Sequence, residues 1–187
     1  MNLKKKMLML LSIIFVASSL QSQDVKTQDK VVQTKMDAFA SRTGVIIKFV
    51  DYNLPALKSF LAGNADTRIR KFTGAGESKY FYQIEKAGQY NSSTASIEYS
   101  DLVEVIKALA TLKTQFDGDV ASTPGYLENK FVTSDGFEIG YYISNEKTKW
   151  YIKLERYGSD NTIFINDVET LTTAFQGAKD KIEALKK

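Results

Sequence analysis

One repeated stretch constrains the fold of this 187-residue chain more than any other feature. The sequence IEYSDLVEVIKAL occupies residues 97–109, and the similar sequence IFINDVETLTTAF occupies residues 163–175. In both, the apolar alternation typical of a strand leads directly into apolar residues at the three- and four-residue spacing of a helix. Two copies of one strand–helix unit predict a fold built from two similar halves.

The similarity continues upstream of these units. Residues 81–86 (FYQIEK) and 151–156 (YIKLER) match position by position, and a polar loop follows each segment. One copy of about 60–70 residues buries too little apolar surface to be stable alone. We therefore expect an α+β domain of two tandem β4α repeats, residues 44–124 and 125–187. Together they should form one antiparallel sheet with helices packed on one face.

The helices of the two repeats are located by their apolar residues, which recur at spacings of three and four. These residues are Leu102, Val105, Ile106, Leu109, Leu112 and Phe116 in the first helix, and Val168, Leu171, Phe175, Ala178, Ile182 and Leu185 in the second. Ser100 or Asp101 is expected to cap the first helix. Asn166, with Glu169 three residues later, is expected to cap the second.

The first repeat differs from the second by an insertion at residues 52–67. Pro55 is expected to begin a short helix there, and Gly63 to end it. Its apolar residues are Leu54, Leu57, Phe60 and Leu61. We expect this segment to plug the end of the sheet, and a lid or a docking element is the alternative.

The N-terminus has the pattern of a secretory signal peptide. Three lysines at positions 4–6 precede an apolar run broken by Ser12, and small residues follow the run. We expect cleavage after Ser22 and a periplasmic or extracellular mature chain beginning at Gln23. No later segment is apolar enough to span a bilayer. Residues 23–43 are expected to form an N-terminal helix with Val32, Met36, Phe39 and Ala40 on its apolar face.

The signal peptide also accounts for the positive charge of the chain. The whole sequence has 25 lysines and arginines against 22 aspartates and glutamates. Three of the lysines precede Ser22, so the mature chain carries 22 groups of each sign and a net charge of zero. Nucleic-acid binding requires surplus cations that displace phosphate counterions. We therefore expect no nucleic-acid partner.

The chain contains neither cysteine nor histidine. Disulfides and thiol catalysis are excluded, and the commonest general base and zinc ligands are missing. We therefore assign no catalytic residue, no metal ligand and no cofactor from the sequence. An exported chain without disulfides fits a bacterial envelope better than a small eukaryotic secreted domain, which is usually cross-linked.

Four short motifs are interpreted as turns. Residues 117–119 (DGD) and 159–161 (SDN) cluster oxygen ligands but lack the spacing of a calcium loop. Residues 73–78 (TGAGES) contain glycines without the lysine of a phosphate-binding loop. Residues 144–147 match the S-x-x-K element of penicillin-binding proteins, but that element requires its serine at a helix start. The last two motifs are expected in hairpin turns.

Two carboxylates occupy equivalent repeat positions, Glu85 and Glu155. Paired carboxylates hydrolyse glycosidic bonds when a suitable distance separates them. The alternative interpretation is that each is an ordinary surface residue near the end of a strand.

The strand phases predict an aromatic sheet face without a helical cover. If Trp150 points into the core, Tyr151 points away from it. A turn centred on residues 146–147 would place Tyr142 opposite Tyr151, and Phe164 on the next strand would face the same way. Phe81 occupies the position of Tyr151 in the first repeat. We predict Tyr142, Tyr151, Phe164 and Phe81 as partner- or ligand-binding residues, and cross-strand packing without function is the alternative.

These observations favour a non-enzymatic, exported binding module of a bacterial envelope. It would use the open sheet face to bind a protein, a peptide or an envelope glycan. The alternatives are a carboxylate-dependent extracytoplasmic hydrolase and a structural subunit of an envelope assembly. In the structural subunit, the aromatic face would form a contact between subunits.

The signal peptide is tested by N-terminal sequencing of the protein from the cell envelope. We expect the first residue to be Gln23 or a close neighbour, because the small residues before it suit the peptidase. An envelope protein that retains Met1 would contradict cleavage.

Overall fold

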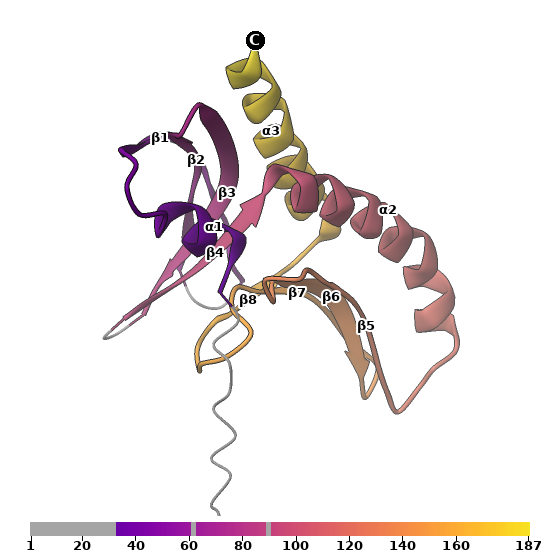
Figure 1. Cartoon of the computed structure of the whole chain (residues 1–187). Helices are drawn as coiled ribbons and strands as arrows, with labels where there is room; N and C mark the ends of the chain where they lie inside the picture. The colour runs from indigo at the N-terminus through magenta and orange to yellow at the C-terminus, as the bar shows by residue number, and fades with distance from the viewer. Residues whose placement is uncertain (1–32, 61–62, 89–90) are drawn as a thin grey trace, which may run out of the picture. The chain divides into compact units, whose positions relative to one another are not determined.

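A computed structural model describes residues 33–60, 63–88 and 91–187, so the expected signal peptide and residues 23–32 lie outside it. A short helix is followed by two runs of four strands and a long helix (Figure 1). The short helix is α1 (Lys35–Ala40), and the first run comprises β1 (Ile47–Leu57), β2 (Ala65–Gly74), β3 (Glu77–Ala87), β4 (Ser92–Glu98) and α2 (Tyr99–Ala121). The second comprises β5 (Tyr126–Val132), β6 (Glu138–Ser144), β7 (Lys147–Lys153), β8 (Thr162–Ile165) and α3 (Val168–Lys186).

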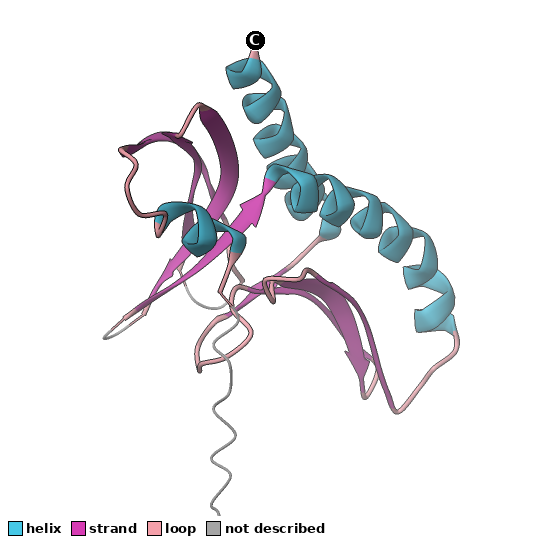
Figure 2. Ribbon diagram, viewed as in Figure 1, coloured by secondary structure: helices cyan, strands magenta, loops and turns pink. Residues whose placement is uncertain are grey.

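The strands form two four-stranded antiparallel sheets, ordered β1-β2-β3-β4 and β5-β6-β7-β8 (Figure 2). The prediction of an α+β fold with two β4α halves is confirmed, whereas the prediction of one shared sheet is wrong. At the edge of the first sheet, the backbone N–H of Thr94 in β4 donates to the carboxylate of Glu155 at 2.8 Å. A side chain thus takes a donor that a continuous sheet would pair with another strand.

Both expected hairpin turns are confirmed, at the β2–β3 and β6–β7 connections. Ala75 and Gly76 have φ angles of 50° and 78°, and Asn145 and Glu146 have φ angles of 48° and 64°. Two central residues with positive φ are the mark of the tight turn that matches the twist of paired strands. The S-x-x-K match therefore lies in a turn, away from any helix start.

The second turn sets a register that differs from the predicted one. Ser144 pairs with Lys147, and Tyr142 pairs with Lys149 rather than with Tyr151. The turn is centred one residue earlier than expected, which displaces the pairing by two residues. Because side chains alternate with a period of two, this shift leaves every residue on its predicted face.

Each long helix packs against strands of both sheets. α2 contacts β3 and β4 of the first sheet and β5 and β6 of the second, and α3 contacts β1 and β2 of the first sheet and β8 of the second. The ring of Phe116 in α2 lies 4.9 Å from that of Tyr141 and 5.3 Å from that of Trp150, measured between centroids. Phe175 in α3 meets Tyr82 edge to face at 5.4 Å. The two halves therefore share one apolar core.

The predicted apolar stripes of both helices are confirmed. Four residues of each helix are buried: Leu102, Val105, Leu109 and Leu112 in α2, and Leu171, Phe175, Ala178 and Ile182 in α3. The other four predicted residues are partly buried against the same core: Ile106, Phe116, Val168 and Leu185. In the described part of the chain, no helix combines the length and hydropathy required to cross a membrane.

The caps of the long helices differ from the predicted ones. Neither Ser100 nor Asp101 caps α2, whose first turn follows Glu98 without a side-chain cap bond. α3 is capped by Asp167, one residue after the expected Asn166, and its carboxylate accepts the backbone N–H three residues later at 2.8 Å. α2 thus begins earlier than predicted, directly after β4 ends at Glu98, whereas α3 begins one residue later than predicted.

The helix expected in the insertion at residues 52–67 is wrong for the residues that the structure describes. β1 continues through Pro55 to Leu57 as the outermost strand of its sheet. A proline is tolerated there because an edge strand needs no N–H on its free side. The pairing with β2 shifts register between Leu54 and Leu57, so the strand is irregular around Pro55.

The residues after β1 connect the two sheets. The backbone N–H of Phe60 donates to the carbonyl oxygen of Phe164 in β8 at 2.9 Å. β8 is the last strand of the second sheet, so this bond lies on its free edge. Residues 61–62, which include the predicted apolar Leu61, lie outside the described part of the chain.

The DGD segment at residues 117–119 is not the expected turn, because it lies inside α2. The carboxylate of Asp119 accepts the hydroxyl of Tyr141 at 2.6 Å and the amide of Asn129 at 3.3 Å. Burial and this bond to Asp119 raise the pKa of Tyr141 to about 12. These contacts to the second sheet favour an additional helical turn at the end of α2.

The packing of α3 on the first sheet is tested by replacing Phe175 with alanine. We expect the free energy of unfolding to fall by about 3–5 kcal/mol, because the substitution leaves a cavity against Tyr82. Tyr157→Ala is the control, since that side chain is 67% exposed, and its effect should stay within about 0.5 kcal/mol. Urea unfolding measures both. Equal effects of the two substitutions would contradict the packing of α3 on the first sheet.

Candidate functional site

The predicted aromatic residues of the second half lie on one face of its sheet, opposite the core. Tyr142 pairs with Lys149, and Tyr151 pairs with Phe164, so these four side chains project from the same face. Their neighbours Trp150 and Ile152 are buried in the core on the other side. We call this surface the outer face of the second sheet.

The aromatic rings on the outer face are in contact. The ring of Tyr142 lies 6.4 Å from that of Tyr151 and meets Phe164 edge to face at 6.3 Å. Phe60 adds a further ring, 48% exposed, with the ammonium of Lys149 at 3.7 Å from its centroid. The structure thus brings together three of the four predicted residues and adds Phe60, whose strand-edge position was missed.

Tyr151 is not exposed as predicted. Only 6% of the residue is accessible, because the partly buried rings of Tyr142 and Phe164 flank it on neighbouring strands. Its hydroxyl donates to the carboxylate of Glu128 in β5. Burial, and then this hydrogen bond, raise the pKa of Tyr151 well above its usual range. Tyr151 therefore lies beneath the more accessible rings of Tyr142, Phe164 and Phe60, which we call the aromatic patch.

Phe81 is likewise not exposed, and 1% of it is accessible. It lies on the predicted face of the first sheet, but α1 covers that face. Phe39 of α1 contacts Phe72 at 5.9 Å, and Phe72 meets Phe81 edge to face at 5.8 Å. The sequence predicted a helix in this region without indicating the surface that it covers.

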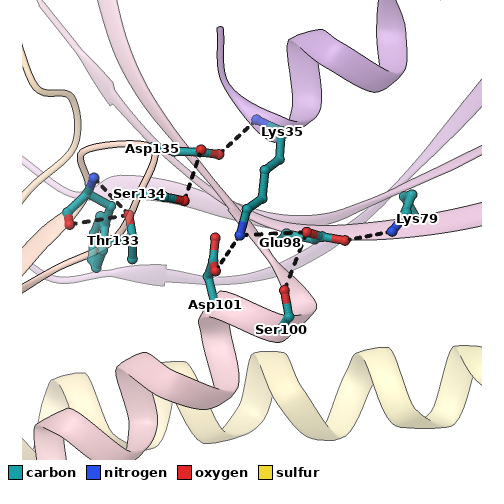
Figure 3. A network of polar contacts seen from close by, with 9 residues as sticks. Lys35, Lys79, Glu98, Ser100, Asp101, Thr133, Ser134 and Asp135 are labelled. Atoms are coloured by element: carbon teal, nitrogen blue, oxygen red, sulfur yellow. Dashed lines mark hydrogen bonds and ion pairs between the residues drawn. The ribbon is translucent and has the colours of Figure 1, made fainter. Parts of the chain in front are cut away.

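A polar network anchors α1 (Figure 3). The backbone N–H of Lys35 donates to Asp135 in the β5–β6 connection at 2.9 Å. Its ammonium binds the carboxylate of Asp101 at 2.5 Å and lies 3.9 Å from that of Glu98. Lys79 binds Glu98 from the other side at 3.0 Å. α1 is thus bonded to both halves while its Phe39 packs on the first sheet.

The outer face of the second sheet retains exposed apolar groups. Tyr126 and Val132 in β5 are 64% and 45% exposed. Both belong to the same side of β5 as Glu128, which pairs with Tyr142. The outer face of the first sheet is therefore covered by α1, whereas the equivalent face of the second sheet keeps exposed apolar residues.

The two carboxylates at equivalent repeat positions have structural partners. Glu85 forms an ion pair with Arg68 at 2.7 Å within the first sheet. Glu155 accepts the backbone N–H of Thr94 and so joins the two sheets. Both carboxylates therefore have structural roles, Glu85 between two strands of the first sheet and Glu155 between the β7–β8 loop and β4. Among the described residues, no group of three or more aspartates or glutamates is arranged to hold a metal ion.

Lys86 is a buried lysine that the sequence analysis did not single out. Only 6% of it is accessible. Its ammonium donates to the carboxylate and the carbonyl of Asp160 at 2.6 and 3.0 Å, and to the carbonyl of Thr162 at 3.2 Å. Three acceptors match its three protons, which suits a structural clamp on the β7–β8 loop better than a nucleophile. The sequence signal that could have identified Lys86 is its position on the core-facing side of β3.

A separate concavity lies between the end of β1 and α3. It has a volume of about 800 Å³, within the usual range of ligand sites. We call it the β1–α3 groove, and its apolar lining includes Leu54, Pro55, Leu57, Tyr82, Ala174 and Gly177. Sequence reasoning missed it because the extension of β1 through Pro55 was not expected.

Comparison with known proteins gives no further guide to these sites. The sequence matches no protein-family model and no curated protein, and the fold matches no solved structure. The assignment of function therefore depends on the geometry of this chain.

The clamp formed by Lys86 is tested by Lys86→Met, which keeps the apolar stem and removes the donors. We expect a loss of about 1–3 kcal/mol in unfolding free energy and faster hydrogen exchange in the β7–β8 loop. The control is Lys107→Met, because that lysine is 67% exposed and pairs only within its own helix. It should change stability by less than about 0.5 kcal/mol. Unchanged exchange in the loop would contradict the clamp.

Proposed function

We propose that this chain is a non-enzymatic, exported binding module of a bacterial envelope. The outer face of the second sheet holds its partner, which is a protein, a peptide or a glycan. One observation carries the proposal: a helix covers the outer face of the first sheet, and the equivalent face of the second sheet keeps accessible aromatic rings. α1 covers Phe81 in the first half, whereas Tyr142, Phe164 and Phe60 remain partly or largely accessible in the second.

The chemistry of the outer face suits recognition. Aromatic rings supply large contact areas at a low cost in side-chain entropy, and they are enriched at protein interfaces. Charged groups of both signs border the rings, since Lys149 lies over Phe60 and Glu128 binds Tyr151. Strands hold these side chains in fixed positions, which reduces the ordering that binding requires.

An oligomeric structural subunit would use the same patch for a different purpose. Its aromatic rings would then contact a second copy of the chain. Size-exclusion chromatography with light scattering separates the two cases, because the binding module is expected to elute as a monomer.

The proposed site is tested by a double variant, Tyr142→Ser with Phe164→Ser. The mature protein serves as bait for envelope extracts and for an array of envelope glycans, and the affinity of the partner found is then measured. We expect the double variant to lose at least about tenfold in affinity, because two rings near the centre of the patch are removed. Stability should fall by only about 1–2 kcal/mol, since cross-strand contacts alone are lost.

The matched control is the double variant Phe49→Ser with Tyr157→Ser. These two aromatic residues are 55% and 67% exposed and lie outside the patch. Their replacement should leave partner affinity unchanged. A patch variant that folds and retains full affinity would show that the outer face is not the site.

A further inference from the structure

The β1–α3 groove has the shape of a site for an elongated apolar ligand. Its lining runs along α3 from Thr170 to Lys181, a distance of about 16 Å at the rise of an α-helix. Leu54 and Leu57 form the opposite wall, and Tyr82 lies at its base. A long, mostly apolar groove suits a linear chain better than a compact ring.

The edge of β1 at the groove is unsuited to an added peptide strand. Strand addition requires a regular row of backbone donors and acceptors on the free edge. Pro55 has no N–H, and the ladder with β2 shifts register between Leu54 and Leu57. The carbonyl of Pro55 already accepts the hydroxyl of Thr67 at 2.9 Å. A ligand without backbone hydrogen bonds fits this position.

Gly177 keeps the wall of the groove open. A glycine inside a helix destabilises it by about 0.5–1 kcal/mol relative to alanine. No close approach of another element requires a glycine here, because a Cβ at this position would have no neighbour within 4 Å. The residue therefore leaves space where a larger side chain would fill the groove.

The charges around the groove favour an anionic head group. Glu169 is paired with Lys113 at 2.6 Å, and Asp167 accepts the N–H of Thr170 as the cap of α3. In the described structure, Lys58 and Lys181 form no ion pair with a carboxylate, and the ammonium of Lys181 lies 5.4 Å from the centroid of the Tyr52 ring. The lining thus holds two lysines without a carboxylate partner, while its two carboxylates are engaged.

We propose that the β1–α3 groove binds a linear alkyl chain that carries one anionic head group, as in a long-chain fatty acid. The alkyl chain lies between β1 and α3 over Ala174 and Gly177. Lys58 or Lys181 meets the carboxylate. This site is distinct from the outer face of the second sheet and does not depend on the function proposed for that face.

The site is tested by titrating the mature protein with monomeric hexadecanoate, followed by calorimetry. We expect saturable binding that Gly177→Leu weakens by at least about tenfold, because a leucine displaces two or more methylenes of the ligand. Gly118→Leu is the matched control, since Gly118 is also a helical glycine without a neighbour within 4 Å of a Cβ, but lies in α2. Its affinity should equal that of the wild type.

The head group is tested with ligands of one chain length. Hexadecanoate should bind more tightly than hexadecyltrimethylammonium, and the double variant Lys58→Gln with Lys181→Gln should weaken hexadecanoate by about twofold to fivefold per lysine while sparing hexadecanol. Equal binding of the cationic ligand would overturn the charge assignment. Hexadecanoate that does not bind, or that binds Gly177→Leu as tightly as wild type, would overturn the site. A peptide that binds instead and is lost in Gly177→Leu would favour strand addition.

Discussion

The packing of each long helix across both halves is the interaction on which the rest of the fold depends. Phe116 of α2 packs against the second sheet, and Phe175 of α3 packs against the first. Each long helix contacts strands of its own half and of the other half, so the apolar residues of the two halves form one core. A single β4α copy would lose the contacts made with the other half and expose apolar residues of its sheet and helix, so the two copies are expected to fold together.

The two long helices occupy one face of each sheet, and the opposite, outer faces of the two sheets differ in their cover. α1 covers the first, where Phe39, Phe72 and Phe81 form a small second core. Lys35 fixes α1 by binding Asp101 at the start of α2 and Asp135 in the second half. Among the described residues, no helix covers the outer face of the second sheet, where the rings of Tyr142 and Phe164 stay partly accessible.

The sheet face on which each side chain lies was predictable from the sequence. The register between paired strands and the covering of a sheet face by a helix were not. Tyr142 and Tyr151 lie on the predicted face because alternation is a property of each strand alone, and a two-residue shift preserves it. The register depends on positive φ angles at Asn145 and Glu146. A glutamate rarely adopts such an angle, so the sequence did not indicate where the turn is centred. Phe81 lies on the predicted face, but its exposure was wrongly predicted. An amphipathic helix in the sequence indicates that its apolar side packs on some surface, but not on which of two similar sheet faces.

The end of β1 shows how one irregularity has two consequences. Pro55 and the register shift protect an edge strand from pairing with another chain, as edge strands require. The same irregularity turns the strand away from regular sheet geometry beside α3, where Gly177 supplies no side chain to fill the space. A regular β1 with a larger residue at position 177 would close the groove and expose a strand edge. Protection of the edge and an open apolar groove therefore arise together from the segment in which the first half departs from the second.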